Sequence, residues 1–420
     1  MRKSLTSMLR VAATAAVACA LTAAPAVTAA PPPGFASSNV EWLANVPLHA
    51  DTAGARLVGK RLFIADSRSL TVYDVSQPEL PKPVGAFGLP EVPYYPQEDV
   101  DTDGRILILG QGSPNPTGLL WVFDVTAEQP QLLATLQGAS SHTVSCVLRC
   151  TWVYNSNGTI TDLREPARPH IAGDWRKGTG VTTAHDVTEV SPGVVVTSSN
   201  PMLLLDARAN PAQPRLVARG RMPDKRFVHA NLWPNAARDR LLLVGGETEG
   251  GNCSDRSAGA FATFDASRWR RTGTLRFLDE YRAPDTLPTA GGFPVATWCS
   301  HWFTPRPGYR NGGMVAAGWY EHGTRLLNVA GNGKIREAGW FIPAGTTASQ
   351  AYWVTRDILY VLDYNRGLDV IRIHDGAVRR GESRPRVVRG LAPWQAPLRR
   401  VALRPSYSGL QCPVPVPAAR

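Results

Sequence analysis

One short pattern recurs along most of the chain: an apolar strand-like run, an Asp or other polar stop, and then usually a Pro-marked turn before the next run. Two clear copies are Leu70-Thr-Val-Tyr-Asp74-Val and Leu120-Trp-Val-Phe-Asp124-Val. The copies lie at residues 70–76, 120–126, 158–163, 202–207, 260–267, 324–329 and 368–373. Four-stranded units repeated about every 40 to 50 residues are the signature of a propeller. The repeat therefore predicts an all-β fold, a seven-bladed β-propeller of four-stranded blades.

The two ends of the repeat array are unequal. After Ile373 no further strand is evident, whereas Val40-Glu-Trp-Leu-Ala-Asn-Val-Pro47 near the start resembles an outer strand. We predict that this N-terminal strand completes the last blade, because closing the ring removes exposed sheet edges. The predicted organisation is a signal peptide at 1–30, a short Pro-rich linker at 31–38, the propeller at 39–375 and an Arg/Pro-rich tail at 376–420.

The first thirty residues have the layout of a secretory signal peptide. Residues 1–10 carry three basic side chains and no acidic one, an Ala/Val/Leu-rich stretch follows, and Val27-Thr28-Ala29 offers small residues for cleavage. Lipidation of Cys19 is an alternative. No later apolar run approaches the roughly 20 residues needed to span a bilayer. We therefore expect a secreted, extracellular protein with no transmembrane segment.

The net charge of +11 is concentrated at the two ends of the chain. Without residues 1–30 and 376–420 the chain has 33 basic and 33 acidic residues. The repeat region is therefore electroneutral, and no nucleic-acid binding is expected. The tail, with nine arginines and one glutamate, is either a solvated extension or a contact for cell-wall polyanions.

Cysteines in an exported protein are expected to be paired. Cys146 and Cys150 flank Val-Leu-Arg in a segment that reads as two strands around a tight turn, which predicts a disulfide across a hairpin. Cys253 and Cys299 form the plausible second bridge, and Cys412 is left odd. The connectivity is not determined by the sequence.

These features resemble the LVIVD-repeat family of secreted bacterial β-propellers. The likeness includes the two strand copies quoted above, the His142-x3-Cys146-x3-Cys150 spacing, Cys299-Ser-His301-Trp-Phe and Asp363-Tyr-Asn-Arg-Gly-Leu-Asp369. It covers nearly the whole chain apart from the tail. What the resemblance implies is mainly a fold, since members of the family generally lack an assigned activity.

Alignment of the first strand of each blade places four of the eight histidines at one repeat position. The aligned residues are Glu98, His142, His185, His229, His301 and Gln350. Because the first strand of each propeller blade lines the central channel, we predict a ring of imidazoles near its mouth. Imidazoles with a carboxylate suit a transition metal such as copper, zinc or iron. Alternatively, histidine there only bonds water and neighbouring carbonyls.

Further candidates for ligand contacts are Gln350, Trp302, His322 and Arg325, although a turn at Gly323 explains His322 as well. The regularly placed aspartates, such as Asp74 and Asp124, are predicted to bond local backbone amides rather than to catalyse a reaction. The leading hypothesis is a ligand or protein partner bound at the channel mouth, with possible metal assistance. A metal-dependent oxidase or hydrolase and a non-catalytic cell-surface scaffold are the alternatives.

Overall fold

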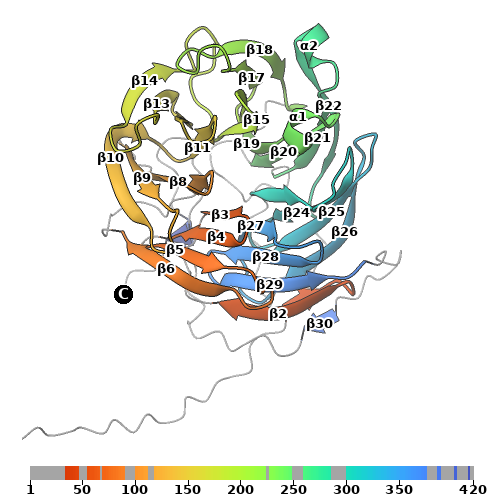
Figure 1. Ribbon diagram of the computed structural model, residues 1–420. Coiled ribbons are helices and arrows are strands. Elements are labelled where there is room, and N and C mark those ends of the chain that lie inside the picture. Colours follow the sequence, from red (N-terminus) through yellow and green to blue (C-terminus); the bar gives the residue numbers. More distant parts are fainter. Residues whose placement is uncertain are drawn as a thin grey trace, which may run out of the picture.

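The computed structural model describes residues 34–46, 54–66, 69–89, 100–111, 118–223, 227–247, 259–284, 299–375, 386–388, 402–403 and 415–416. Within these ranges strands are the predominant secondary structure, and the sheets radiate from a common centre (Figure 1). The only helices there are the single turns α1 (Pro234–Ala237) and α2 (Trp269–Thr272). No helix in this part of the protein is long and apolar enough to cross a membrane.

Three separate four-stranded antiparallel sheets follow one another along the chain. The first contains β3 (Gly54–Val58), β4 (Arg61–Ala65), β5 (Ser69–Asp74) and β6 (Lys82–Gly88). The second contains β7 (Val100–Thr102), β8 (Ile106–Gln111), β9 (Gly118–Asp124) and β10 (Gln131–Ser140). The third contains β11 (Val144–Val147), β12 (Trp152–Asn155), β13 (Thr159–Asp162) and β14 (His170–Asp174).

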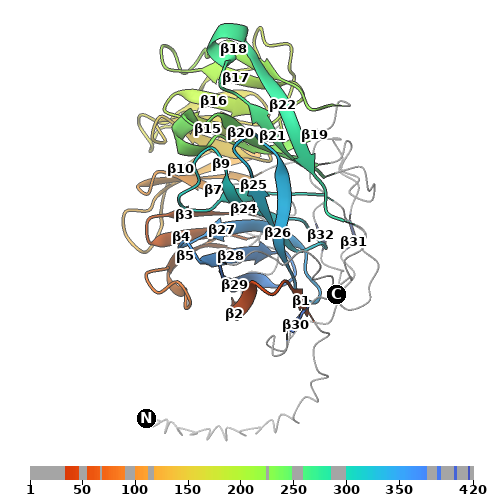
Figure 2. The same cartoon turned by 90° about the vertical axis from the view of Figure 1, so that its right-hand side faces the viewer.

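The next two units share one eight-stranded sheet, because their outer strands β18 and β22 pair in parallel. One unit is β15 (Val187–Ser191), β16 (Val194–Thr197), β17 (Met202–Asp206) and β18 (Arg215–Gly220). The other is β19 (Phe227–Leu232), β20 (Leu241–Glu247), β21 (Phe261–Asp265) and β22 (Thr274–Tyr281). Figure 2 shows β22 running along the outside of the ring.

A sixth unit is extended by strands from both ends of the propeller. It consists of β23 (Phe303–Pro305), β24 (Gly313–Gly318), β25 (Thr324–Val329) and β26 (Ile335–Ile342). On its outer edge β1 (Gly34–Ala36) pairs with β26, and β30 (Arg386–Val388) pairs with β1. The predicted linker at 31–38 and tail at 376–420 thus each contribute a strand, because an open sheet edge offers unpaired amides and carbonyls. The remaining pair is β31 (Ala402–Leu403) with β32 (Pro415–Val416).

The last unit is closed by the N-terminal strand, as predicted. It contains β27 (Ala348–Trp353), β28 (Ile358–Asp363) and β29 (Gly367–Ile373), and β2 (Val40–Val46) pairs antiparallel with β29. Trp42 Nε1 and Asn45 Nδ2 both donate to Asp369 Oδ1, at 3.0 and 2.9 Å. Arg366 Nε lies 2.7 Å from Asp369 Oδ2. A buried ion pair therefore anchors the strand that joins the two ends of the ring.

The sheets pack face to face, which explains why the repeated strands are apolar on both faces. Along β4, Leu62 and Ile64 pack against the sheet of β27–β29, whereas Phe63 and Ala65 pack against the sheet of β7–β10. Successive side chains of a strand point to opposite faces, so each middle strand serves two interfaces. All four side chains are fully buried.

The strand order contains seven runs of four antiparallel strands within the described ranges, one for each predicted repeat. The all-β propeller and its closure by an N-terminal strand are thereby confirmed. The predicted signal peptide at 1–30 lies outside the described residues.

Candidate functional site

The four aligned histidines lie side by side in the predicted order. His142 precedes β11, His185 precedes β15, His229 lies in β19 and His301 precedes β23, so four consecutive units contribute one ring each. The ring centroids are 4.9 Å apart for His142 and His185, 3.9 Å for His185 and His229, and 4.2 Å for His229 and His301. The repeat register thus correctly predicted which histidines meet.

Three of these imidazoles are buried in the interior, and His142 is partly exposed. His185 is 1 % exposed, and His229 and His301 are fully buried. His185 Nδ1 lies 2.9 Å from His229 O, and His301 Nδ1 lies 2.7 Å from Ser349 O, each on the next unit around the ring. Because a carbonyl only accepts, both Nδ1 atoms carry the proton. The histidines therefore link neighbouring inner strands.

The last unit has serine where the alignment expected Gln350. The carbonyl that accepts from His301 is that of Ser349, and the one that accepts from His185 is that of His229. Ser349 and His229 also occupy the same irregular place in the pairing of β27 and β19. The alignment was therefore wrong by one residue at this position, since Ser349 rather than Gln350 is equivalent to His229.

A metal site at these histidines remains a prediction. No three or more His, Cys, Asp or Glu side chains in the described ranges are arranged as a group that could hold a metal ion. The predicted carboxylate partner, Glu98, lies outside the described residues. The proximity of the four rings is consistent with the copper, zinc or iron hypothesis. The described residues do not show the geometry of metal ligands.

A cavity of about 320 Å³ occupies the centre of the ring. It is lined from β3, β7, β11, β19, β23 and β27, and from β15 together with the residue that precedes it. The polar lining side chains are Arg56, Asp101, Thr102, Asp103, Ser145, Arg149, Asp186, Thr188, Glu189, Asn231, Trp302, Thr304, Gln350 and Tyr352. Because every unit supplies its inner strand, this cavity is the central channel.

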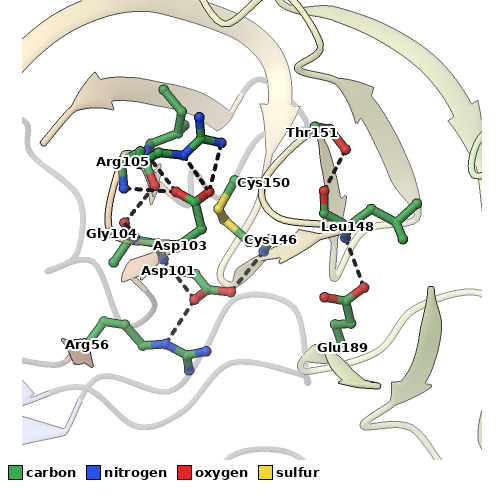
Figure 3. Close-up of a disulfide and its surroundings, with 12 residues drawn as sticks. Arg56, Asp101, Asp103, Gly104, Arg105, Cys146, Leu148, Cys150, Thr151 and Glu189 are labelled. Carbon is green, nitrogen blue, oxygen red and sulfur yellow. Dashed lines mark hydrogen bonds and ion pairs between the residues drawn. A yellow bond between two sulfur atoms is a disulfide. The ribbon is translucent and has the colours of Figure 1, made fainter. Parts of the chain in front are cut away.

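Asp101 is held on one wall of the cavity by charge and backbone donors. Arg56 Nε lies 3.0 Å from Asp101 Oδ1, and the backbone amide of Cys146 donates to Asp101 Oδ2 at 2.9 Å (Figure 3). Asp103 forms the adjoining turn, where its Oδ1 accepts from the amides of Arg105 and Ile106. Asp101 itself lines the channel.

The hairpin disulfide forms the neighbouring wall and supports a glutamate. Cys146 and Cys150 are bonded, with their Cα atoms 4.3 Å apart, and Leu148 between them donates its amide to Glu189 Oε1 at 2.9 Å (Figure 3). Gly193 N donates to the same oxygen at 2.7 Å. Burial raises the pKa of Glu189, these two amides oppose the rise, and the charge of Asp101 adds to it.

The predicted disulfides have different outcomes. The Cys146–Cys150 bond is confirmed. Cys299 is disulfide-bonded, but the expected partner Cys253 lies outside the described residues, as does Cys412. That pairing therefore stays a prediction.

Two of the four weaker ligand candidates line the cavity and two do not. Trp302 and Gln350 are part of its wall. His322 N donates to Trp319 O at 2.9 Å in the turn that precedes β25. Arg325 is fully buried between units, where its Nη1 lies 3.3 Å from Glu337 Oε2. Neither His322 nor Arg325 lines the cavity.

The regularly spaced aspartates form turns, as predicted. Each accepts a hydrogen bond from the backbone amide two residues later: Asp74 from Ser76, Asp124 from Thr126, Asp162 from Arg164, Asp206 from Arg208 and Asp265 from Ser267. These are Asx turns at the outer ends of the third strands.

Sequence reasoning missed the acidic and amide side chains of the cavity. Asp186 directly follows His185, Glu189 is four residues after it, and Asn231 is two residues after His229. A signal was present, since each of the three lies one to four residues after an aligned histidine. Asp101 carries no such signal, because the aligned residue of its repeat is Glu98 rather than a histidine.

Comparisons with known proteins show the fold alone. No family model and no curated protein matches the chain. Among solved structures, the Cps50 (Swd1) β-propeller domain of Myceliophteria thermophila is 11 % identical, with a TM-score of 0.55 over 78 % of this chain and 98 % of that one. The WD40 propeller domain of Doa1 is 10 % identical, with a TM-score of 0.53 over 80 % and 98 %. The RRP9 WD40 repeats are 12 % identical, with a TM-score of 0.51 over 82 % and 99 %.

Proposed function

We propose that this chain is an exported β-propeller binding protein whose central cavity holds a small ligand. One observation carries the proposal: the cavity of about 320 Å³ is walled by all seven units and lined by convergent polar groups. Its volume lies at the small end of the range for small-molecule sites, about 300 to 1,000 Å³. Export rests on the leader-like residues 1–30.

Charged and polar side chains from several units support a ligand site rather than a packed channel. Arg56, Asp186 and Thr304 lie on three different units, and all three line the cavity. Polar groups that converge on one cavity are typical of a small-molecule site. The alternative to a small ligand in the cavity is a protein partner that binds at the rim of the propeller.

Filling the cavity tests the proposal. Gln350→Trp places a large ring in the wall, and Gln213→Trp makes the same change at an exposed outer turn. Thermal unfolding is measured with a panel of amines, sugars and carboxylates. We expect at least one class to raise the Tm of the native protein and of Gln213→Trp but not of Gln350→Trp. A panel without effect on the native protein would contradict the proposal.

The predicted metal site is tested separately by elemental analysis. Purified protein is exposed to copper, zinc, iron and manganese and then desalted. If the four aligned histidines hold a metal, the native protein should retain it after desalting. The variants His185→Ala and His229→Ala should lose the metal, and the control His170→Ala, on the outer strand β14, should retain it. A metal-to-protein ratio near zero in the native protein would reject the metal-site hypothesis. Circular dichroism of each variant verifies that its loss of metal is not a loss of fold.

We also propose that the C-terminal tail attaches the protein to the cell wall. Deleting residues 389–420 removes five of the nine tail arginines, from Arg389 onward, and keeps β30. Reduced binding to purified anionic cell-wall polymer supports the attachment, and unchanged binding removes it.

A further inference from the structure

We propose that the Cys146–Cys150 disulfide is a redox-controlled restraint on the wall of the central cavity, which an external dithiol opens without unfolding the propeller. Reduction of the bond releases the turn at residues 148–150 and separates Leu148 from Glu189. The inference goes beyond the proposed ligand binding and does not depend on it, because the bond and the turn are both observed without a ligand.

The disulfide closes a turn with an uncommon backbone. Leu148, Arg149 and Cys150 all have positive φ, at 52°, 60° and 53°, and none of them is glycine. In this left-handed region the Cβ atom lies too close to the following carbonyl oxygen, which disfavours each residue by about tenfold relative to the right-handed form. Three such residues in succession therefore need a restraint that holds them in place.

A second left-handed turn in the protein is held by hydrogen bonds. Asn235, Ala236 and Ala237, between β19 and β20, have φ values of 54°, 53° and 60°. Asn235 Nδ2 donates to Asp239 Oδ2 at 2.8 Å and to Tyr309 O, on the next unit, at 3.0 Å. This turn contains no cysteine, so side chains and the neighbouring unit supply its restraint.

The 148–150 turn has a different set of restraints (Figure 3). Leu148 N donates to Glu189 Oε1 at 2.9 Å, and Thr151 Oγ1 donates to Leu148 O at 2.7 Å. Among the described residues, Arg149 and Cys150 make no hydrogen bond that would hold their backbone. The covalent bond between Cys146 and Cys150 is therefore the main restraint on these two residues.

The disulfide can be approached from the cavity. Cys146, Arg149 and Cys150 all line the cavity wall. Cys146 is 9 % exposed and Cys150 is 1 % exposed, so Cys146 is the half of the bond that a reagent in the cavity meets first. Strained disulfides have more oxidising potentials than ordinary structural ones and are the labile or regulatory class. Here the strain lies in the backbone that the bond closes.

The proposed step is a thiol–disulfide exchange in which an external dithiol is the reductant. A thiolate of the dithiol attacks Sγ of Cys146, the S–S bond breaks, and its electron pair leaves on Cys150 Sγ, which takes up a proton. The second thiol of the reductant then displaces Cys146 Sγ, which is protonated in turn. Both cysteines are thereby reduced to thiols, and the dithiol is oxidised to its own disulfide.

Reduction is expected to change one wall of the cavity and leave the propeller intact. The bond joins two residues of a single hairpin, so its loss separates no two units. Glu189 keeps the amide of Gly193, at 2.7 Å, and loses that of Leu148. Arg149 is then no longer confined to its present place in the wall.

A redox titration of the full chain tests the proposal. The protein is equilibrated with dithiothreitol and its oxidised form at a series of ratios, alkylated, and examined by mass spectrometry. We expect Cys146 and Cys150 to be reduced at a lower ratio than Cys299, which is disulfide-bonded and fully buried, with unchanged circular dichroism. Reduction only together with Cys299, or only with loss of the circular dichroism signal, would overturn the proposal.

Hydrogen exchange measures the release of the turn. In the reduced protein, amide exchange over residues 147–151 should rise at least about tenfold, because Leu148 N leaves Glu189. Exchange in the buried strand β17 should stay the same, since no unit separates. A reduced protein that exchanges at residues 147–151 as slowly as the oxidised one would show that the bond does not restrain the turn.

Glycine variants separate backbone strain from other causes of lability. Arg149→Gly removes the left-handed cost, so its reduction should be about tenfold less favourable, about 30 mV for a two-electron couple. Arg149→Ala removes the same charge but keeps that cost, and should behave as the native chain does. Ala236→Gly relieves the other left-handed turn and should leave the Cys146–Cys150 equilibrium unchanged. An equal effect of Arg149→Gly and Arg149→Ala, or no effect of Arg149→Gly, would refute the proposal.

Discussion

Carboxylates at the outer turns and carboxylates in the interior of the propeller differ in the direction of their pKa. At the outer turn after β17, the hydrogen bond from Arg208 lowers the pKa of Asp206 to about 2. In the interior, burial raises the pKa of Glu189, and it raises the pKa of Asp363 to about 6. An ionised carboxylate therefore stabilises the folded state at the outer turn and destabilises it in the interior.

The difference separates structural acids from acids retained for another purpose. An outer aspartate gains from ionisation because backbone amides and arginines meet its charge. An interior acid loses solvation, so its presence needs a compensating role. For Asp369 that role is ring closure with Arg366, and for Glu189 we infer ligand binding. Four predictions follow, three at these acids and one at the disulfide that supports Glu189.

The largest effect is expected at the ring closure. Asp369→Asn leaves the guanidinium of Arg366, which is 4 % exposed, without its buried carboxylate. Breaking a buried ion pair in this way costs about 3 to 5 kcal/mol. Urea unfolding measures the loss. Asp357→Asn on the same unit, where the carboxylate is half exposed, is the control and should cost less than about 1 kcal/mol. Equal losses would remove the distinction.

Removing the hairpin disulfide should have the next largest effect. In the chain-entropy account, replacing Cys146 and Cys150 by Ser releases a five-residue loop at a cost of about 2 kcal/mol. The loop presents Leu148 N to Glu189, so the interior acid loses an oriented donor as well. The midpoint of urea unfolding reports the change. A double variant as stable as the native chain would show that the hairpin holds its shape unaided.

A smaller loss is expected at an outer turn. Asp206→Ala removes the acceptor for Arg208 N and should cost about 1 kcal/mol at pH 7. Because the folded pKa of about 2 lies below the unfolded value of about 3.9, this stabilisation is present above pH 4 and is lost as pH falls through 2. The native chain and the variant should therefore converge in acid. A difference that grows in acid would contradict the turn assignment.

The smallest effect, and the only stabilising one, is expected at Glu189. Its folded pKa is raised, so the native state holds the proton more tightly and stability falls as pH rises through the range above about 4.3. Glu189→Gln removes that loss and should be more stable than the native chain at pH 8 and equal to it near pH 4. Thermal unfolding at the two pH values measures this, and a variant less stable at pH 8 would show that the carboxylate is structural.

Features with a local or periodic cause could be predicted from the sequence. The Asx turns depend on residues two apart, the hairpin disulfide on residues four apart, and strand pairing within a unit on neighbouring segments. The repeat register also brought His142, His185, His229 and His301 together, because equivalent positions of successive units are adjacent in a ring. It failed by one residue at Gln350, since Ser349 is the residue equivalent to His229.

The sequence by itself determined the propeller, its closing strand and the identity of the meeting histidines, since each follows from periodicity. Only the tertiary structure decided that His185, His229 and His301 are buried, and that Asp186, Glu189 and Asn231 line one cavity. The cavity brings together side chains separated by hundreds of residues, such as Arg56 and Gln350. Which way each inner strand turns its side chains depends on the pleat, bulges and packing of seven units at once, and no local pattern records that.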